Sequence, residues 1–161
     1  MYEYVRNLPY VESVSIGGHS QGGVVASMLA GELGEDAFKG VVLFSPAGHV
    51  KDLMLQGNFP VAGAFDPNNP PEKLHLRDTY SLGREYIVTT QTLPIYETAA
   101  KYTGPVCIIY GTADEAVPYS YIQKYDEIYA NSELHLIDGA NHGFSGHEDE
   151  AANIAVNFLK K

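Results

Sequence analysis

Short apolar runs alternate along this chain with segments whose apolar residues recur at helical spacing. Apolar runs at 14–18, 41–45, 106–111 and 134–137 predict buried strands, and the small-residue segment 23–30 predicts a helix after the first of them. Strands that are separated by helices form parallel sheets, because a parallel pair needs a crossover connection. We therefore expect an α/β fold with a mostly parallel sheet and flanking helices.

The end of the chain predicts one more helix, over Glu148–Leu159. Ala151, Ile154, Ala155 and Phe158 recur at helical spacing. The acidic residues at 148–150 fall in the first turn, where the helix dipole favours negative charge. This acidic run therefore indicates a helix start rather than a metal site.

A long interval, about 47–93, separates the second strand from the third. It contains four prolines, which exclude a long helix, and too many apolar residues for a disordered segment. A loop of this length inside a compact domain is usually functional. We expect a cap, inserted into a single domain that spans 1–161 and lying over the carboxyl ends of the strands.

The candidate chemistry begins with the G-x-S-x-G pattern at Gly18–Gly22. A serine on a sharp turn between a strand and a helix exposes its hydroxyl, and we expect a side chain at Gly18 or Gly22 to collide with the turn. The helix start behind Ser20 favours developing negative charge, so the Gln21 N–H is a candidate oxyanion donor. Ser20 is the candidate nucleophile, although such a turn can also be a simple tight connection.

A nucleophilic serine needs a base and an acid that orients this base. Asp114 follows the apolar strand 106–111, and His142 follows the strand 134–137. The order Ser20, Asp114, His142 is the order found in α/β-hydrolases. Glu115 remains an alternative acid.

Other acidic residues and histidines have weaker placements. Asp138 has the sequence context of a turn former beside a glycine. His135 lies within a strand and is expected to pack or to face solvent. His19, in the variable position of the turn, is expected to line the floor of the substrate pocket.

These motifs resemble the α/β-hydrolase superfamily. The segments that carry the resemblance are Gly18-His19-Ser20-Gln21-Gly22-Gly23, Gly111-Thr112-Ala113-Asp114 and Gly139-Ala140-Asn141-His142. The longer stretches 22–31, 93–97 and 124–129 are more narrowly similar to bacterial cinnamoyl and feruloyl esterases. The resemblance implies a partial α/β-hydrolase fold whose insertion holds an aromatic acyl group.

In that family the insertion contacts the phenolic ring. The candidates here are Asp52, Tyr86 and Gln91, which would bind the ring hydroxyl of the substrate. The alternative is that Asp52 is a surface acid and that Tyr86 packs within the insertion.

The chain departs from the family before the turn that carries Ser20. Family members have several strands there and an H-G loop that donates a second oxyanion N–H, whereas this sequence reaches Gly18 almost at once, and 1–8 resembles only the end of a helix. We therefore expect a carboxyl-terminal portion, and the loss of one donor typically lowers the rate about 100- to 1,000-fold. The strand at 14–18 is then expected to be an exposed edge that invites homodimerisation.

The composition of the chain narrows the partners, cofactors and location that can be expected for it. The chain has 161 residues, 45% of them hydrophobic, and a formal net charge of −10, which disfavours nucleic acids and anionic membrane surfaces as partners. The single cysteine, Cys107, lies in an apolar strand and is expected in the core. No zinc-type spacing and no phosphate loop is present, so neither a metal nor a cofactor is indicated. The sequence has no secretion signal or long apolar run, and we expect a cytoplasmic protein.

Three functions are consistent with these observations. The first is a serine carboxylesterase that cleaves hydroxycinnamoyl esters. The second is another serine hydrolase, such as an acylaminoacyl peptidase, a lipase or a thioesterase. The third is an inactive truncated chain.

Overall fold

The computed structural model describes residues 1–76 and 80–161, which divide into two compact units. The first unit combines Met1–Gly48 with Ile95–Lys161, and the second consists of His49–Pro94. The second unit thus interrupts the first in sequence, at nearly the same residues as the expected insertion at about 47–93.

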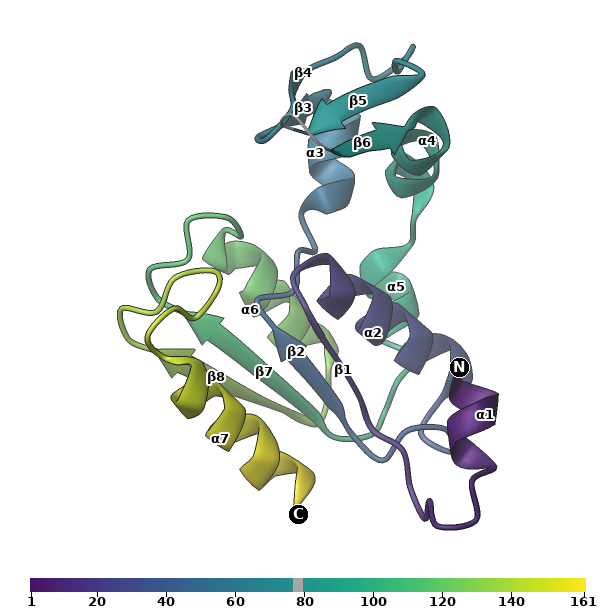
Figure 1. Cartoon of the computed structure of the whole chain (residues 1–161), viewed down its shortest axis with the longest axis vertical. Coiled ribbons are helices and arrows are strands. Elements are labelled where there is room, and N and C mark those ends of the chain that lie inside the picture. Colours follow the sequence, from purple (N-terminus) through teal and green to yellow (C-terminus); the bar gives the residue numbers. More distant parts are fainter. Residues whose placement is uncertain (77–79) are drawn as a thin grey trace. The chain divides into compact units, whose positions relative to one another are not determined.

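A four-stranded parallel sheet forms the centre of the first unit (Figure 1). Its strands are β1 (Ile16–His19), β2 (Val41–Phe44), β7 (Val106–Gly111) and β8 (Ser132–Ile137), in the order β1-β2-β7-β8. Each neighbouring pair is parallel. The α/β fold predicted from the sequence is confirmed.

For the first strand, the burial predicted from its apolar run is wrong, whereas the exposed edge expected from the departure from the family is what the structure has. In β1, Ile16 and Gly18 are half-buried, whereas Gly17 and His19 are exposed. The physical reason is its position, because β1 is an edge strand that pairs only with β2 among the described residues. β7, in contrast, lies between two strands and is buried throughout, as its unbroken apolar run predicts.

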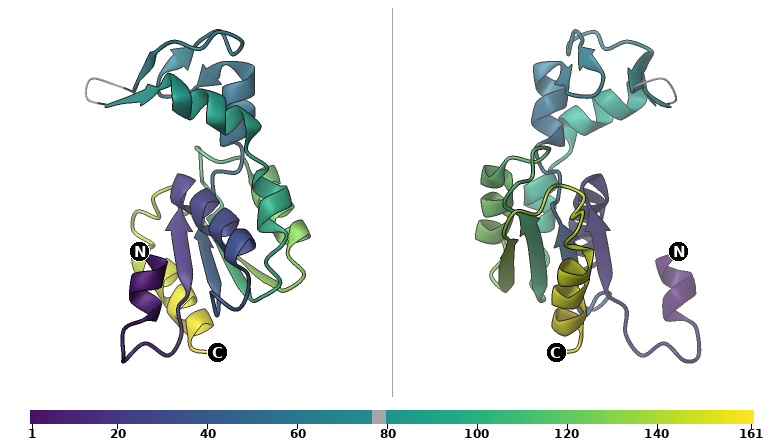
Figure 2. Two further views of the ribbon diagram at one scale, coloured as in Figure 1. Left: turned by 90° about the vertical axis from the view of Figure 1, so that its right-hand side faces the viewer. Right: turned by 60° about the vertical axis from the view of Figure 1, so that its left-hand side comes forward.

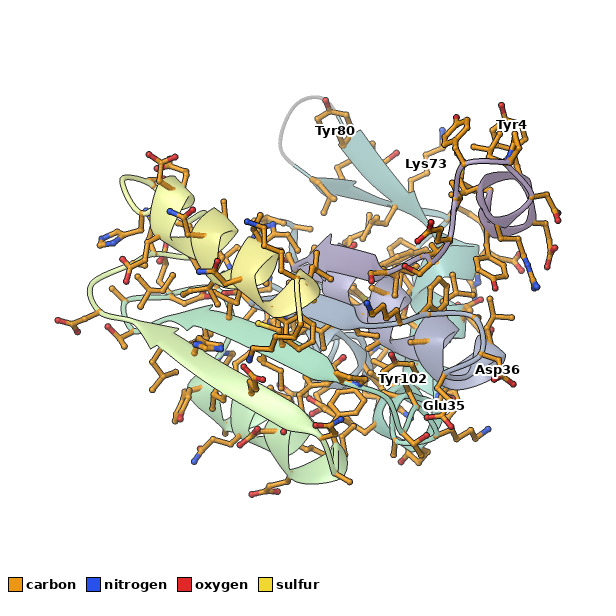
Figure 3. The ribbon with its side chains drawn as sticks, turned by 90° about the horizontal axis from the view of Figure 1, so that it is seen from below. Tyr4, Glu35, Asp36, Lys73, Tyr80 and Tyr102 are labelled. Carbon is orange, nitrogen blue, oxygen red and sulfur yellow. The ribbon has the colours of Figure 1, made fainter. Side chains whose placement is uncertain are left out.

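Helices cover both faces of the sheet, as Figure 3 shows from below. One face carries α2 (Gln21–Leu33) and α6 (Tyr119–Ile128), and α5 (Ile95–Ala99) packs against α2. The other face carries α7 (Glu148–Leu159), which has the bounds that the sequence predicts.

The interface between α7 and the sheet is apolar. Ala151, Ala155 and Phe158 of α7 share one buried cluster with Val42 and Cys107 of the sheet. Burying apolar side chains in such a cluster stabilises the folded state by about 0.8 kcal/mol for each CH₂ group that is removed from water. Cys107 is fully buried, as expected for a cysteine that serves as a core residue.

The first unit also contains a short amino-terminal helix, α1 (Tyr2–Arg6), where the sequence predicts the end of a helix. The Tyr2 ring lies 5.1 Å from the Phe38 ring. The Tyr102 hydroxyl donates to the Phe38 carbonyl oxygen at 2.8 Å, and burial, with the nearby Glu35 carboxylate, raises the pKa of Tyr102 to about 12 (Figure 3). Tyr102 therefore remains a neutral donor that fixes the loop after α2.

The second unit combines two helices with two short hairpins (Figure 2). The helices α3 (Val50–Gln56) and α4 (Arg84–Thr92) pack together. The hairpins are formed by β3 (Asn58–Phe59) with β4 (Gly63–Ala64), and by β5 (Lys73–Leu76) with β6 (Tyr80–Gly83).

Candidate active site

A strained turn joins β1 to α2 and carries Ser20. The φ and ψ angles of Ser20 are 56° and −121°, which a residue with a side chain rarely adopts. The Ser20 N–H donates to the Phe44 carbonyl oxygen at 2.9 Å, and this bond to β2 helps to hold the turn. Such strain is characteristic of functional positions.

Of the two glycines that flank Ser20, only Gly18 lies where no larger residue would fit. A Cβ atom on Gly18 would lie 2.1 Å from the Gly22 carbonyl oxygen, so no side chain fits there. A Cβ atom on Gly22 would meet nothing within 4 Å, and the predicted collision at Gly22 is therefore wrong. Instead, Gly23 is the second restricted position, because its Cβ would lie 2.9 Å from the Pro46 side chain.

Two hydrogen bonds connect Ser20, His142 and Asp114. His142 Nε2 lies 3.0 Å from Ser20 Oγ, and His142 Nδ1 lies 2.8 Å from Asp114 Oδ2. Ser20, Asp114 and His142 follow β1, β7 and β8, whose carboxyl ends meet at one edge of the sheet. The structure thus brings together three residues that are widely separated in the sequence.

The Asp114 carboxylate is held in a fully buried position. Its Oδ1 accepts the N–H groups of Ala116 and Val117 at 2.8 and 2.9 Å, and its side chain has no exposed surface. Burial raises the pKa of Asp114, but hydrogen bonds, above all from His142 and from the Val117 N–H, outweigh this effect and hold the pKa below its ordinary value. A charged Asp114 accepts the Nδ1–H of His142, which leaves the Nε2 lone pair directed at the Ser20 hydroxyl.

The alternative acids lie apart from this network. Glu115 is exposed. Asp138 is exposed as well, and its Oδ1 accepts a hydrogen bond from the Thr112 hydroxyl at 3.1 Å, which links two loops. His135 is half-buried on β8 and lies 3.5 Å from Glu133. The acid in contact with His142 is Asp114.

The Gln21 N–H lies at the start of α2, and its role as an oxyanion donor stays a prediction. Gln21 is the first residue of α2, where the backbone N–H has no acceptor within the helix. The positive end of the helix dipole adds to its attraction for an anion near Ser20.

His19 makes a contact that sequence reasoning did not predict. Its Nε2 donates to the backbone oxygen of His142 at 2.8 Å, and its ring centroid lies 4.7 Å from that of His142. The sequence places His19 beside Ser20, but it contains no signal for a contact with a loop more than a hundred residues away.

A second residue that sequence reasoning missed is Ser45, directly after β2. It is fully buried with a φ angle of 41°, and its N–H donates to the Ile109 carbonyl oxygen at 2.9 Å. The only sequence signal is its place before Pro46, at the end of a buried strand.

The predicted phenol-binding residues all lie in the second unit. Asp52 on α3 and Tyr86 on α4 are half-buried. The Gln91 amide donates to the carbonyl oxygens of Met54 and Pro67 at 3.1 and 2.9 Å, so it ties α4 to the rest of this unit. Their contact with a substrate stays a prediction.

The described helices also bear on whether the chain could cross a membrane. None of the helices within 1–76 and 80–161 combines the length and apolar character that crossing a bilayer requires.

Comparison with solved structures identifies close relatives of this fold. Est1E from Butyrivibrio proteoclasticus is 29% identical with a TM-score of 0.88, and the alignment covers 99% of this chain and 66% of Est1E. Est1E with ferulic acid bound is 31% identical with a TM-score of 0.89, over 98% of this chain and 63% of that one. A monoacylglycerol lipase from Paleococcus ferrophilus is 18% identical with a TM-score of 0.59, over 90% of this chain and 69% of the lipase, and shares the fold.

This chain therefore spans slightly less than two thirds of the length of Est1E. A comparison with curated proteins finds no match. The profile of the prolyl oligopeptidase family matches residues 1–161. With its α/β-hydrolase fold and this match over its whole length, the chain belongs to the prolyl oligopeptidase family.

Proposed function

We propose that this protein is a serine hydrolase that cleaves carboxylic esters through an acyl-enzyme on Ser20. The observation that carries the proposal is the continuous pair of hydrogen bonds from Ser20 through His142 to Asp114, at 3.0 and 2.8 Å. These distances are within the reach that general-base activation of a serine needs.

The reaction has two halves. His142 Nε2 takes the Ser20 proton while Oγ attacks the ester carbonyl, and the Gln21 N–H stabilises the negative oxygen that forms. His142 then gives this proton to the departing alkoxide, and the alcohol leaves. Water attacks the acyl-enzyme with the same histidine as base, which releases the acid and restores Ser20.

Hydroxycinnamoyl esters are the proposed substrate class. The support is the resemblance to Est1E, a protein with a structure that holds ferulic acid. The second unit, His49–Pro94, is proposed to serve as a cap that selects the acyl group, with Asp52 and Tyr86 contacting the phenolic hydroxyl. A hydroxyl matched by buried polar groups gives strong discrimination against an analogue that lacks it.

The test compares methyl ferulate with methyl cinnamate, which lacks the ring hydroxyl, on wild type, Ser20→Ala and the pair Asp52→Asn and Tyr86→Phe. Wild type is expected to prefer methyl ferulate, and Ser20→Ala is expected to lose all enzymatic hydrolysis. The cap variants should lose this preference while they still hydrolyse methyl cinnamate. Hydrolysis that survives Ser20→Ala would refute the proposed nucleophile.

A peptidase is the second candidate, because the family profile that matches the chain is that of prolyl oligopeptidases. An acylaminoacyl peptidase would use the same three residues on an amide. A peptide p-nitroanilide cleaved faster than methyl ferulate would favour this alternative over the esterase.

A further inference from the structure

The His19 side chain contacts the rings of two residues in the loop 138–147, which follows β8 and is called here the His142 loop. Its centroid is 4.7 Å from the His142 ring and 6.2 Å from the Phe144 ring, and Phe144 in turn lies 6.0 Å from Phe44 of β2. Phe144 is buried and has a φ angle of 57°, so the loop reaches this packing through a strained backbone. His19, although exposed, thus packs its ring against the loop that carries His142.

One hydrogen bond adds to this packing and holds the His19 side chain against the backbone of His142. His19 Nε2 donates to the backbone oxygen of His142 at 2.8 Å, and that oxygen belongs to the residue whose imidazole faces Ser20. The bond spans 123 positions of sequence, from the residue before Ser20 to the loop after β8. It therefore connects the side chain that precedes the nucleophile to the backbone of the candidate base.

The His142 loop has little regular structure of its own. It lies between β8 and α7, and Gly139, Phe144 and Gly146 in it adopt positive φ angles. Within it, the Phe144 N–H donates to the Asn141 carbonyl oxygen, a contact that leaves the His142 oxygen for His19. The start of the loop is tied to the segment after β7, because the Ala113 N–H donates to the Ala140 carbonyl oxygen at 3.0 Å and the Thr112 hydroxyl donates to Asp138 at 3.1 Å. The His19 bond adds a restraint at His142 itself, and its loss gives the imidazole more freedom to move away from Ser20.

We propose that His19 is a positioning residue that holds the His142 imidazole at the Ser20 hydroxyl through its bond to the His142 carbonyl oxygen. This inference rests on the proposed hydrolase function. His19 takes no part in proton transfer, and it acts by keeping the base within hydrogen-bonding distance of the nucleophile. A displacement of about 1 Å at a reacting group can lower the rate roughly 100-fold, so the loss of this bond should lower kcat and leave KM little changed.

The experiment compares His19→Gln with His19→Leu. The glutamine side chain carries an N–H donor at a similar reach, whereas leucine fills a similar space without a donor. His135→Leu is the matched control, because His135 is half-buried on β8 and contacts Glu133 rather than the site. Three quantities are measured for each variant: kcat and KM for an ester, the melting temperature, and the NMR signal of the His142 Nδ1–H in ¹⁵N-labelled protein.

We expect His19→Leu to lower kcat 10- to 100-fold at unchanged KM and to broaden or abolish the His142 Nδ1–H signal. His19→Gln should restore both, and His135→Leu should change neither. An unchanged kcat and signal in His19→Leu, or an equal loss in both His19 variants, would overturn the proposal. A wild-type protein without hydrolysis would refute the proposed function alone, since the NMR comparison would still decide the role of His19.

Discussion

At the scale of single residues, Asp114 shows how burial and hydrogen bonding together set the charge of one group. Its fully buried carboxylate would by itself be easier to protonate, yet two backbone N–H groups and His142 stabilise the charged form. This charge fixes the tautomer of His142, and the proposed chemistry depends on that tautomer.

Replacing Asp114 by asparagine should therefore lower kcat by about 10⁴, because an amide can donate to Nδ1 and so favour the wrong tautomer. Glu115→Gln and Asp138→Asn are matched controls, since each removes one charge from a nearby exposed acid. Both controls should keep near wild-type rates of ester hydrolysis. A large loss in Glu115→Gln with little loss in Asp114→Asn would assign the acid to Glu115.

The lowered pKa of Asp114 also predicts a dependence of stability on pH. Because the folded pKa lies below that of the unfolded chain, the charged carboxylate stabilises the fold above about pH 4. This contribution is lost as pH falls through the folded pKa. Urea unfolding should show a free-energy difference between wild type and Asp114→Asn that is constant near neutral pH and shrinks below about pH 4. A difference that grows on acidification would contradict the sign of the shift.

At the scale of elements, the turn between β1 and α2 depends on close backbone contacts. Gly18→Ala would place its Cβ against the Gly22 carbonyl oxygen, whereas Gly22→Ala meets open space and adds a good helix former. We expect Gly18→Ala to destabilise the protein by about 3 kcal/mol or to prevent folding, and Gly22→Ala to be neutral or stabilising. Chemical denaturation measures both, and equal stabilities would contradict the geometry of the turn.

Sequence reasoning succeeded for elements whose signals are local. The apolar run at 106–111 and the helix at 148–159 have the predicted bounds, since burial and amphipathic spacing are both visible in the sequence. The apolar run at 14–18 alone wrongly predicts burial, because such a run does not show whether a strand has one neighbour or two; the exposed edge is expected only from the resemblance to the family. The open space at Gly22 was likewise invisible, since it depends on backbone angles rather than on composition.

At the scale of the whole molecule, the order of Ser20, Asp114 and His142 predicted a site because the carboxyl ends of parallel strands meet at one edge of the sheet. The contact between His19 and the His142 backbone could not be predicted in this way. It depends on how a loop after β8 folds back towards β1, and no periodicity in the sequence encodes this path.

The edge of the sheet supports a proposal about assembly. The N–H groups of Ile16 and Ser20 donate to carbonyl oxygens on the β2 side, at Gly40 and Phe44. Because successive residues of a strand alternate in direction, the N–H groups of Ser15 and Gly17 face the other side. We propose that this edge pairs with a second copy of the chain.

Size-exclusion chromatography with light scattering tests the proposal. Wild type should elute as a dimer or a larger species, and Ser15→Lys, at an exposed position, should shift it towards the monomer because an edge lysine opposes strand pairing. Glu12→Lys, another exposed site before β1, controls for the effect of added positive charge. A monomeric wild type would contradict the pairing.

The most direct test of the central claim is covalent labelling of Ser20 by a fluorophosphonate, followed by intact and peptide mass spectrometry. We expect a single adduct on Ser20 in wild type, none in Ser20→Ala, and labelling slowed at least about 1,000-fold in His142→Ala. Labelling at another residue, or equal rates in wild type and His142→Ala, would contradict the assignment of Ser20 as a nucleophile activated by His142.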